Sequence, residues 1–506
     1  MTLARTWSVG LAGVSGAMVE VEVDMSAGVP GVALVGLPDA VVRQSVDRVR
    51  AAVVNTGASW PMRRITIGLS PASMPKQGSG FDLALAAAVL AAAGTFPSDA
   101  ADGLVLLGEL GLDGSVRAVR GVLPAVLAAA RAGHGTVVVP AGNAEEAALV
   151  DGVDVLAART LGDLVAHLSG RARLAPHARG PLPPPAPAPD LGDVVGQAAG
   201  RRAVEVAAAG GHHLLLTGPP GAGKTMLAER LPGLLPVLDE RAALEVTAIH
   251  SVAGTLPPDA PLLSRPPFEA PHHSATMAAL VGGGSGAIRP GALCRAHRGV
   301  LFLDEAPEFA RATLDTLRQP LERGQVTISR AAGSATFPCR AQLVLAANPC
   351  PCASAAGDSV CTCSPLERRR YRSRLSGPLL DRIDLRIELP PVTRAAWLDT
   401  RAAPEPTAEV AARVAAARGA AAARLRGTGL LLNSHVPGRL LRERWAVPRP
   451  ALALAERALD RGLLSVRGLD RVLRVSWTLA DLAGRAVPDG GDVAEALGMR
   501  LQRVAA

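Results

Sequence analysis

Lysine is almost absent from this chain of 506 residues, although basic residues are common. Of the 53 lysine and arginine residues, only Lys76 and Lys224 are lysines. An ammonium is a compact point charge and a guanidinium is a planar fork, so the two are not interchangeable at an anion site. We therefore expect Lys224, in a glycine-rich motif, to have a role that arginine could not fill. Lys76 lies in a second glycine-containing motif, where an ordinary surface lysine is the open alternative.

Aromatic residues and long apolar runs are also scarce. Aromatics make up 2% of the chain, so its cores must be built from alanine, valine and leucine. The longest apolar stretch, residues 83–93, is too short to span a bilayer. The N-terminus has no basic segment followed by an apolar one. We therefore expect no membrane partner and a cytoplasmic location, where the six cysteines would be thiols or metal ligands rather than disulfides.

Charge is distributed unevenly along the chain. Residues 1–170 carry 11 basic and 15 acidic side chains, and residues 171–506 carry 42 and 30. A basic C-terminal portion suits a polyanion such as nucleic acid. A solvated arginine-rich surface explains the same numbers, so charge alone does not distinguish a nucleic-acid partner from such a surface.

The pattern of apolar runs predicts four regions: an α/β domain over residues 1–170, a proline-rich linker over 171–190, a second α/β domain over 191–395, and a helical region over 396–506. In the first domain, short apolar runs predict strands and alanine-rich runs predict helices. The linker holds seven prolines between residues 176 and 189 and should form neither helix nor sheet. The expected strands are 19–23, 32–35, 65–67 and 136–139, and the expected helices are 82–93, 123–132, 410–425 and 470–482.

Residues 218–225 have the spacing G-x-x-x-x-G-K-T of a phosphate-binding loop. Its glycines allow backbone N–H groups to turn inward around phosphate oxygens, with the lysine on the β- and γ-phosphates and the threonine on Mg²⁺. An apolar strand at 213–217 and a helix at 226–231 flank it, as this motif requires. The predicted ATP-binding residues are Gly218, Pro219, Pro220, Gly221, Ala222, Gly223, Lys224 and Thr225.

Two further apolar strands end in polar side chains. The strand at 299–303 leads into Asp304, placed to hold Mg²⁺ with Thr225, and Glu305, placed to polarise the attacking water. The strand at 342–347 leads into Asn348, whose amide can orient that water. Ligands at the carboxyl ends of parallel strands are typical of such sheets.

Three stretches together resemble one family: residues 211–231, the motif Phe-Glu-Ala-Pro-His-His at 268–273 with three glycines at 282–284, and Asn-Pro-Cys-Pro-Cys at 348–352. Over its whole length the chain resembles the YifB/ComM family of Mg chelatase-like AAA+ ATPases. The resemblance implies a Lon-protease-like N-terminal domain, an AAA+ core and a helical C-terminal lid. It also implies a hexameric DNA motor of branch-migration type.

The resemblance also assigns roles to single residues. Residues 218–225 fall on Walker A, Asp304 and Glu305 on Walker B, and Asn348 on sensor 1. Arg382 falls on the arginine finger, which acts on a neighbour's nucleotide, and Arg467 on sensor 2, on the γ-phosphate side. A finger implies a homo-oligomeric ring. An ion pair of Arg382 with a neighbouring aspartate is the alternative.

Residues 326–337 read as a hairpin with Arg330 near its tip. In related motors such hairpins line the central pore, so Arg330 and the arginine-rich run 368–372 are candidate nucleic-acid contacts, and Lys76 is a third. Solvated or inter-subunit charges are the alternative for each.

Cys350, Cys352, Cys361 and Cys363 form two C-x-C pairs across a short loop, which can close a tetrahedral Zn²⁺ site. Unliganded thiols are the alternative. Cys294 and Cys339 are expected to be packing residues. The histidine pairs at 212–213 and 272–273 are expected to serve loops or packing rather than a metal.

The N-terminal domain is not expected to cleave peptides. Residues 75–80 resemble the nucleophile loop of Lon-type proteases, but the register places Gly80, not Ser79, at the nucleophile. The helix that should supply the activating lysine, residues 121–127, contains none. Without a base, Ser79 should remain an unreactive hydroxyl.

These observations predict an ATP-binding and ATP-hydrolysing motor that acts as a DNA translocase or helicase, with ATP and Mg²⁺ as cofactors. A chelatase-like motor acting on a protein or metal-porphyrin partner is the alternative. A third reading, an AAA+ protein acting on polypeptides, is disfavoured by the missing lysine.

Overall fold

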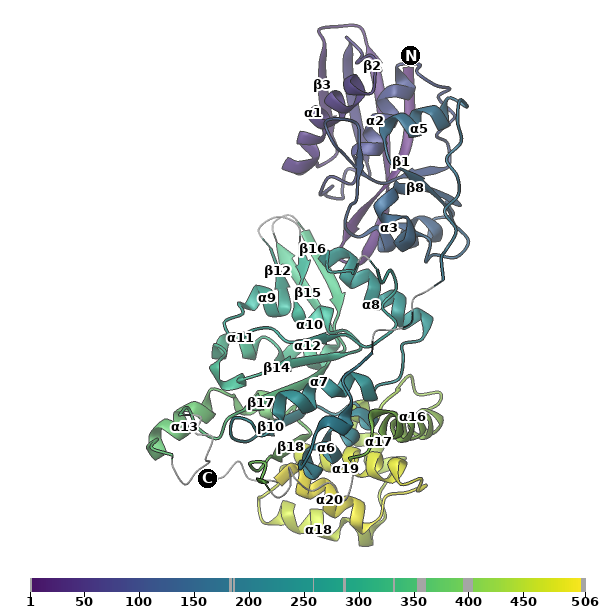
Figure 1. Cartoon of the computed structure of the whole chain (residues 1–506). Helices are drawn as coiled ribbons and strands as arrows, with labels where there is room; N and C mark the ends of the chain where they lie inside the picture. Colours follow the sequence, from purple (N-terminus) through teal and green to yellow (C-terminus); the bar gives the residue numbers. More distant parts are fainter. Residues whose placement is uncertain are drawn as a thin grey trace.

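The computed structural model describes residues 2–181, 184, 187–257, 259–284, 288–330, 333–352, 361–394 and 404–501. Three parts follow one another along the chain: an N-terminal α/β domain, a second α/β domain and a group of C-terminal helices (Figure 1). Among the described residues, no helix is both long enough and apolar enough to cross a membrane.

The N-terminal domain is built on a seven-stranded sheet with the order β3-β4-β2-β1-β5-β8-β9. β1 (Thr2–Ala12) and β2 (Ser15–Ser26) form a long antiparallel pair at its centre. Every residue of α2 (Asp82–Ala92) is buried, because its alanines allow the helix to approach the sheet closely. The predicted strands and helices of this region are confirmed. The other elements are β3 (Gly31–Val35), α1 (Ala40–Asn55), β4 (Arg64–Ser70), β5 (Leu104–Leu106), β6 (Glu109–Leu110), β7 (Val116–Arg117), α3 (Val122–Arg131), β8 (Thr136–Pro140), α4 (Ala144–Ala147), β9 (Asp154–Ala158) and α5 (Leu161–Leu168).

The second domain contains a five-stranded parallel sheet with the order β11-β14-β17-β10-β18. Its strands are short, and three of them are fully buried on both faces, as parallel strands covered by helices usually are. The strands are β10 (Leu214–Thr217), β11 (Phe268–Glu269), β14 (Val300–Leu303), β17 (Gln342–Ala347) and β18 (Leu385–Glu388), and the helices are α6 (Ala198–Gly210), α7 (Lys224–Leu234), α8 (Glu240–Ala253), α10 (Ala292–Arg295), α11 (Arg311–Asp315), α12 (Arg318–Arg323), α13 (Pro365–Ser373) and α14 (Gly377–Leu380).

Two insertions extend this domain toward the N-terminal domain (Figure 1). The first comprises α9 (Met277–Val281), β12 (Gly282–Gly283) and β13 (Arg289–Pro290). The second is the predicted hairpin, β15 (Gln325–Arg330) and β16 (Gly333–Pro338). A Cβ on Gly282 would lie 2.6 Å from Ile328 Cδ1, so the two insertions are in tight contact. Residues 285–287 and 331–332, which include the hairpin tip, lie outside the described residues.

The C-terminal helices pack against α6 and α7, and one hydrophobic core joins them to the sheet. The predicted helices at 410–425 and 470–482 are confirmed as α16 (Thr407–Arg424) and α19 (Val466–Leu482). The expected boundary at residues 395–396 lies outside the described residues. In the described part of residues 171–190, no helix or strand is present apart from one bridge at Pro176. The remaining helices are α17 (Gly438–Glu443), α18 (Arg449–Asp460) and α20 (Gly490–Leu501).

The two α/β domains are in direct contact through α3 and α8. The side chain of Ser251 donates to Glu146, and the backbone N–H of Gly121 donates to the carbonyl of Ser251 at 3.3 Å. A cavity of about 490 Å³ lies beside this contact, lined by both domains and by the β16 hairpin strand.

Candidate nucleotide-binding site and its surroundings

The loop at residues 218–225 leaves β10 at the carboxyl edge of the sheet. Gly221 and Gly223 have φ values of +77° and +86°, which L side chains adopt only with strain. A Cβ on Gly218 would lie 2.6 Å from the Leu389 carbonyl, so this position also needs glycine. The loop then enters α7 at Lys224, and the helix N-terminus points its free N–H groups into the loop. This is a cradle for phosphate.

Lys224 lies buried beneath this loop. Its Nζ donates to the carbonyls of Gly218 and Pro219 at 2.7 and 2.9 Å, and to Oδ1 of Asn348 at 3.0 Å. Burial lowers the pKa of Lys224, while the nearby carboxylates of Asp304 and Glu305 oppose that shift. The structure therefore brings the loop lysine and the end of β17 together, as expected from the sequence.

Thr225 and the two carboxylates that follow β14, Asp304 and Glu305, lie at the same edge of the sheet as the loop. The hydroxyl of Thr225 donates to Asp304 Oδ2 at 2.8 Å, and the other oxygen of Asp304 accepts the N–H of Glu305 at 2.9 Å. A hydroxyl beside a carboxylate is the oxygen pair that suits Mg²⁺. Glu305 has a φ of +48°, which is uncommon for a residue with a side chain and typical of a functional site.

Glu305 has one further partner that sequence reasoning missed. Nδ1 of His273 lies 3.3 Å from Glu305 Oε2, and both side chains are partly exposed. The rings of His272 and His273 lie with their centroids 4.0 Å apart and are tilted by 34° to each other. The two histidines had been expected to serve a loop or packing. β11 pairs in parallel with β14, and His273 follows β11 by four residues. This position in the sequence could have predicted the contact.

Arg382 does not lie at this edge. Leu385 of β18 pairs with Leu214 of β10, so Arg382, which precedes β18, is at the amino edge of the sheet and away from the loop. Its guanidinium pairs with Glu322, not with the neighbouring aspartates. Arg467 is exposed in the first turn of α19, one turn before Arg471. Arg382 therefore does not meet the phosphate loop of its own chain.

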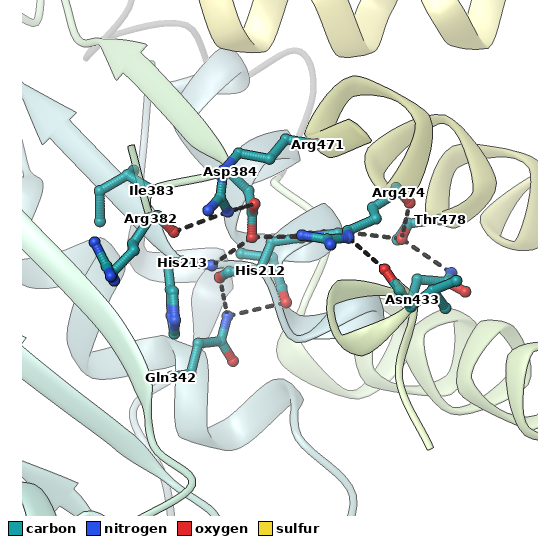
Figure 2. A network of polar contacts seen from close by, with 12 residues as sticks. His212, His213, Gln342, Arg382, Ile383, Asp384, Asn433, Arg471, Arg474 and Thr478 are labelled. Carbon is teal, nitrogen blue, oxygen red and sulfur yellow. Dashed lines mark hydrogen bonds and ion pairs between the residues drawn. The ribbon is translucent and has the colours of Figure 1, made fainter. Parts of the chain in front are cut away.

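A buried polar network ties the lid to this amino edge (Figure 2). Nη1 of Arg471 on α19 reaches Asp384 Oδ1 at 2.5 Å and the carbonyl of Arg382 at 3.1 Å. Burial would raise the pKa of Asp384, but its contacts with His212 and Arg471 hold it well below its usual range. His212 in turn contacts Thr478 of α19 through Nε2 at 2.8 Å. The backbone beside Arg382 is thus fixed by a residue of the lid.

The four clustered cysteines come together in space. Cys350 Sγ lies 3.2 Å from Cys352 Sγ and 3.3 Å from Cys361 Sγ, and all four sulfurs are within 4.8 Å of one another. A tetrahedral centre with Zn–S bonds of about 2.3 Å requires sulfurs roughly 3.8 Å apart. The donor set therefore fits a zinc ion, although part of the intervening loop, residues 353–360, lies outside the described residues.

The other two cysteines are buried packing residues, as expected. Burial raises the pKa of the Cys294 thiol to about 12, so it stays protonated and unreactive. Cys339 is also buried, at 1% exposure.

Of the expected nucleic-acid contacts, Arg330 is exposed at the end of β15, and Arg369 and Arg370 are exposed on α13.

Lys76 was also a candidate nucleic-acid contact, and the structure contradicts this prediction. Its side chain is fully buried, and its Nζ donates to the carbonyl of Pro71. An ammonium in this position cannot reach a phosphate, so Lys76 serves the N-terminal fold. The loop holding it is fixed in part by Asp39, which accepts the N–H of Gly78 at 3.2 Å.

Ser79 lines the cavity between the domains, and its hydroxyl donates to Glu109. Sequence reasoning had not identified Glu109. The buried Lys76 donates to a backbone carbonyl and does not contact this hydroxyl. The surroundings of Ser79 are therefore consistent with an unreactive hydroxyl.

Comparison with known families matches three consecutive segments to one subunit. Residues 190–397 match "Magnesium chelatase, subunit ChlI", residues 21–143 match "Subunit ChlI of Mg-chelatase", and residues 404–500 match its C-terminal family. Together these segments cover most of the chain.

Three relatives match over nearly the whole chain. An uncharacterized protein of Mycobacterium tuberculosis is 57% identical over 500 residues, 99% of each chain. The competence protein ComM of Haemophilus influenzae is 42% identical over 506 residues, 99% of this chain and 98% of the relative. The uncharacterized protein YifB of Escherichia coli is 40% identical over 486 residues, 95% of this chain and 94% of the relative.

Proposed function

The chain belongs to the Mg chelatase-like AAA+ ATPase family that includes ComM and YifB, and on this premise we propose that it hydrolyses ATP to move DNA. The observation that carries the hydrolysis is the convergence of the loop lysine with the side chains that follow β14 and β17. Gly221 and Gly223 shape a cradle that directs backbone N–H groups at the phosphates, and Lys224 is placed to reach them.

Each remaining side chain at this edge has one task in hydrolysis. Thr225 and Asp304 would hold Mg²⁺, which offsets the negative charge of the phosphates when it is bound. Glu305 polarises the attacking water and Asn348 orients it. Lys224→Ala should weaken ATP binding, whereas Glu305→Gln should bind ATP and fail to hydrolyse it. Wild-type rates of phosphate release in both variants would contradict this assignment.

The positions of Arg382 and Arg467 favour a ring. Arg382 lies at the sheet edge opposite the loop of its own chain, and Arg467 is on the helix whose Arg471 contacts the Arg382 backbone, which supports contact of both with the nucleotide of a neighbouring subunit. We therefore propose composite sites in a homo-oligomeric ring, a hexamer by family resemblance, with Arg382 as the finger and Arg467 as sensor 2.

DNA is the proposed substrate for two reasons. Residues 171–506 carry 42 basic and 30 acidic side chains, and exposed Arg289 and Arg330 lie on the adjoining insertions. One relative is named a competence protein. The alternative is a chelatase-like motor with a protein or metal-porphyrin partner, and ATP hydrolysis that is indifferent to every form of DNA would favour it.

Two proposals concern the other regions. We propose that the four clustered cysteines bind one Zn²⁺, which would join the loop after Asn348 to α13.

We also propose that the N-terminal domain is Lon-like in descent and has no protease activity. A serine-directed fluorophosphonate probe should leave Ser79 unlabelled, and its labelling would refute the second proposal.

A further inference from the structure

The cavity between the two α/β domains is bordered by two places where the domains touch. At one, a Cβ on Gly13, which follows β1, would lie 2.9 Å from the carbonyl of Thr336 in β16. At the other, Gly121 precedes α3, and a Cβ on it would lie 3.5 Å from a methyl of Val252 in α8. Figure 1 shows β16 and α8 beside the N-terminal domain. The cavity thus belongs to the junction of the two domains and to the hairpin insertion.

Its size and much of its wall suit an apolar ligand body. A volume of about 490 Å³ lies within the range of small-molecule pockets, roughly 300–1,000 Å³. Val9, Leu11, Leu107, Val122 and Ile288 are among the lining residues. Close-packed proteins leave few voids larger than a water molecule. A partly apolar space of this size is therefore more than an ordinary packing defect.

The charged side chains at the cavity favour an anion. Among the described lining residues they are Glu109, Arg120 and Arg289. Glu109 already accepts the hydroxyl hydrogen of Ser79. Arg120 belongs to the N-terminal domain and Arg289 to β13 of the first insertion, and both side chains are exposed. Two cations therefore face the cavity, one from each domain, against one carboxylate that has a donor.

We infer that this cavity binds a small organic anion with an apolar body, whose acidic group is held by Arg120 and Arg289. Guanidinium groups suit this task because they offer several N–H donors to one carboxylate, sulfonate or phosphate. The inference goes beyond ATP hydrolysis and DNA movement, since binding here needs neither nucleotide nor DNA. A ligand held from both domains would stabilise their contact, which makes the cavity a site for an effector.

The test uses 8-anilinonaphthalene-1-sulfonate, a fluorescent probe that joins an apolar aromatic body to one acidic group. Full-length protein without nucleotide or DNA should bind it in the cavity. Arg120→Gln and Arg289→Gln should each weaken binding about tenfold, as loss of a hydrogen bond to a charged group does. Arg117→Gln is the matched control, because Arg117 is exposed on β7 and is not a lining residue. Binding by both lining variants with the affinity of wild type would overturn the inference.

A second pair of variants fills the cavity. Gly80 is a lining residue, and a Cβ on it would meet no atom within 4 Å, so Gly80→Leu can enter the space without a backbone clash. It should abolish the probe site. Gly135→Leu is the control, since a Cβ there also meets no atom within 4 Å and Gly135 is not a lining residue. Unchanged probe binding by Gly80→Leu that remains folded by circular dichroism would refute the site.

A second ligand tests whether the acidic group is recognised. N-Phenyl-1-naphthylamine has the same aromatic body without the sulfonate, so it should bind wild type more weakly and with an affinity that Arg289→Gln does not change. Equal affinities for the two compounds would show an apolar gap without anion recognition and would overturn the inference.

Two further measurements separate this cavity from the sites already proposed. Lys224→Ala should keep the probe site, and its loss there would place the probe at the phosphate loop instead. Arg289 is also a proposed DNA contact. If a single-stranded oligonucleotide displaces the probe and Gly80→Leu weakens DNA binding, the cavity belongs to the DNA path, and the small-anion site is refuted.

Discussion

Arg471 of the lid helix α19 donates to the backbone carbonyl of Arg382 at 3.1 Å, across the boundary between the C-terminal helices and the sheet. The same guanidinium pairs with buried Asp384, so the segment that holds Arg382 cannot move independently of α19. Arg467 lies one turn earlier on that helix. The two arginines proposed to act on a neighbour's nucleotide are therefore parts of one rigid unit.

This arrangement predicts that Arg382 acts only on a neighbouring subunit. Arg382→Ala should lower the rate of ATP hydrolysis by about 10³- to 10⁵-fold, as loss of an arginine finger does, and leave ATP binding intact. Mixing it with Lys224→Ala should recover part of the activity, because a hybrid interface pairs an intact loop with an intact finger. Arg439→Ala, at an exposed arginine of α17, is the control. Absence of any recovery in mixtures that do exchange subunits would contradict the composite site.

The cysteine cluster predicts one zinc ion per chain. Full-length protein purified without chelators should contain zinc at a one-to-one ratio by elemental analysis, and Cys350→Ser should lose it. Cys339→Ala removes a buried thiol outside the cluster and should retain the metal. Zinc-free protein with four freely titratable clustered thiols would refute the site.

Burial of His213 predicts a loss of stability in mild acid. Burial lowers the pKa of His213 to about 4, whereas an unfolded histidine titrates near 6.5. As pH falls from about 6.5 to 4, the unfolded state takes up a proton that the folded state does not, so the free energy of unfolding must fall. Above this window the contribution of His213 is constant.

The measurement is urea-induced unfolding at pH 7 and pH 5. Nδ1 of His213 accepts the N–H of Leu343 at 3.0 Å, and the amide oxygen of asparagine can take that place. His213→Asn should therefore show a smaller drop between the two pH values than wild type. His134→Asn, in the N-terminal domain, should keep the wild-type drop. An equal drop in both variants would show that His213 is not responsible.

Local sequence patterns were sufficient to predict the elements that hold the loop and its carboxylates. The strand at 342–347 was predicted with the bounds that β17 has, because the five apolar residues after Gln342 fit a strand buried on both faces. The glycines and Lys224 were predicted because phosphate binding requires these residue types at this spacing. The contact of His273 with Glu305 was not predicted, because it depends on the pairing of β11 with β14, whose paired residues are 32 positions apart in the chain.

Local sequence patterns did not predict which side chains are buried or at which edge of the sheet they lie. Lys76 was a candidate nucleic-acid contact, with a surface lysine as the alternative, but the packing of its loop encloses it completely. Arg382 was placed on the finger by resemblance, and only the pairing of β18 with β10 shows that it lies at the sheet edge away from its own loop. Such features follow from contacts between distant segments, which no single stretch of sequence contains.

The central claim is that ATP hydrolysis at this site moves DNA. Its most direct measurement is ATP-dependent release of a labelled strand from forked or four-way DNA, with wild type, Glu305→Gln and Arg330→Ala. Wild type should release the strand, with binding that weakens steeply with salt because phosphate contacts free counterions. Glu305→Gln should bind DNA without releasing it, and Arg330→Ala should hydrolyse ATP without moving the strand. Active hydrolysis by wild type with no strand release from any DNA form would contradict the account.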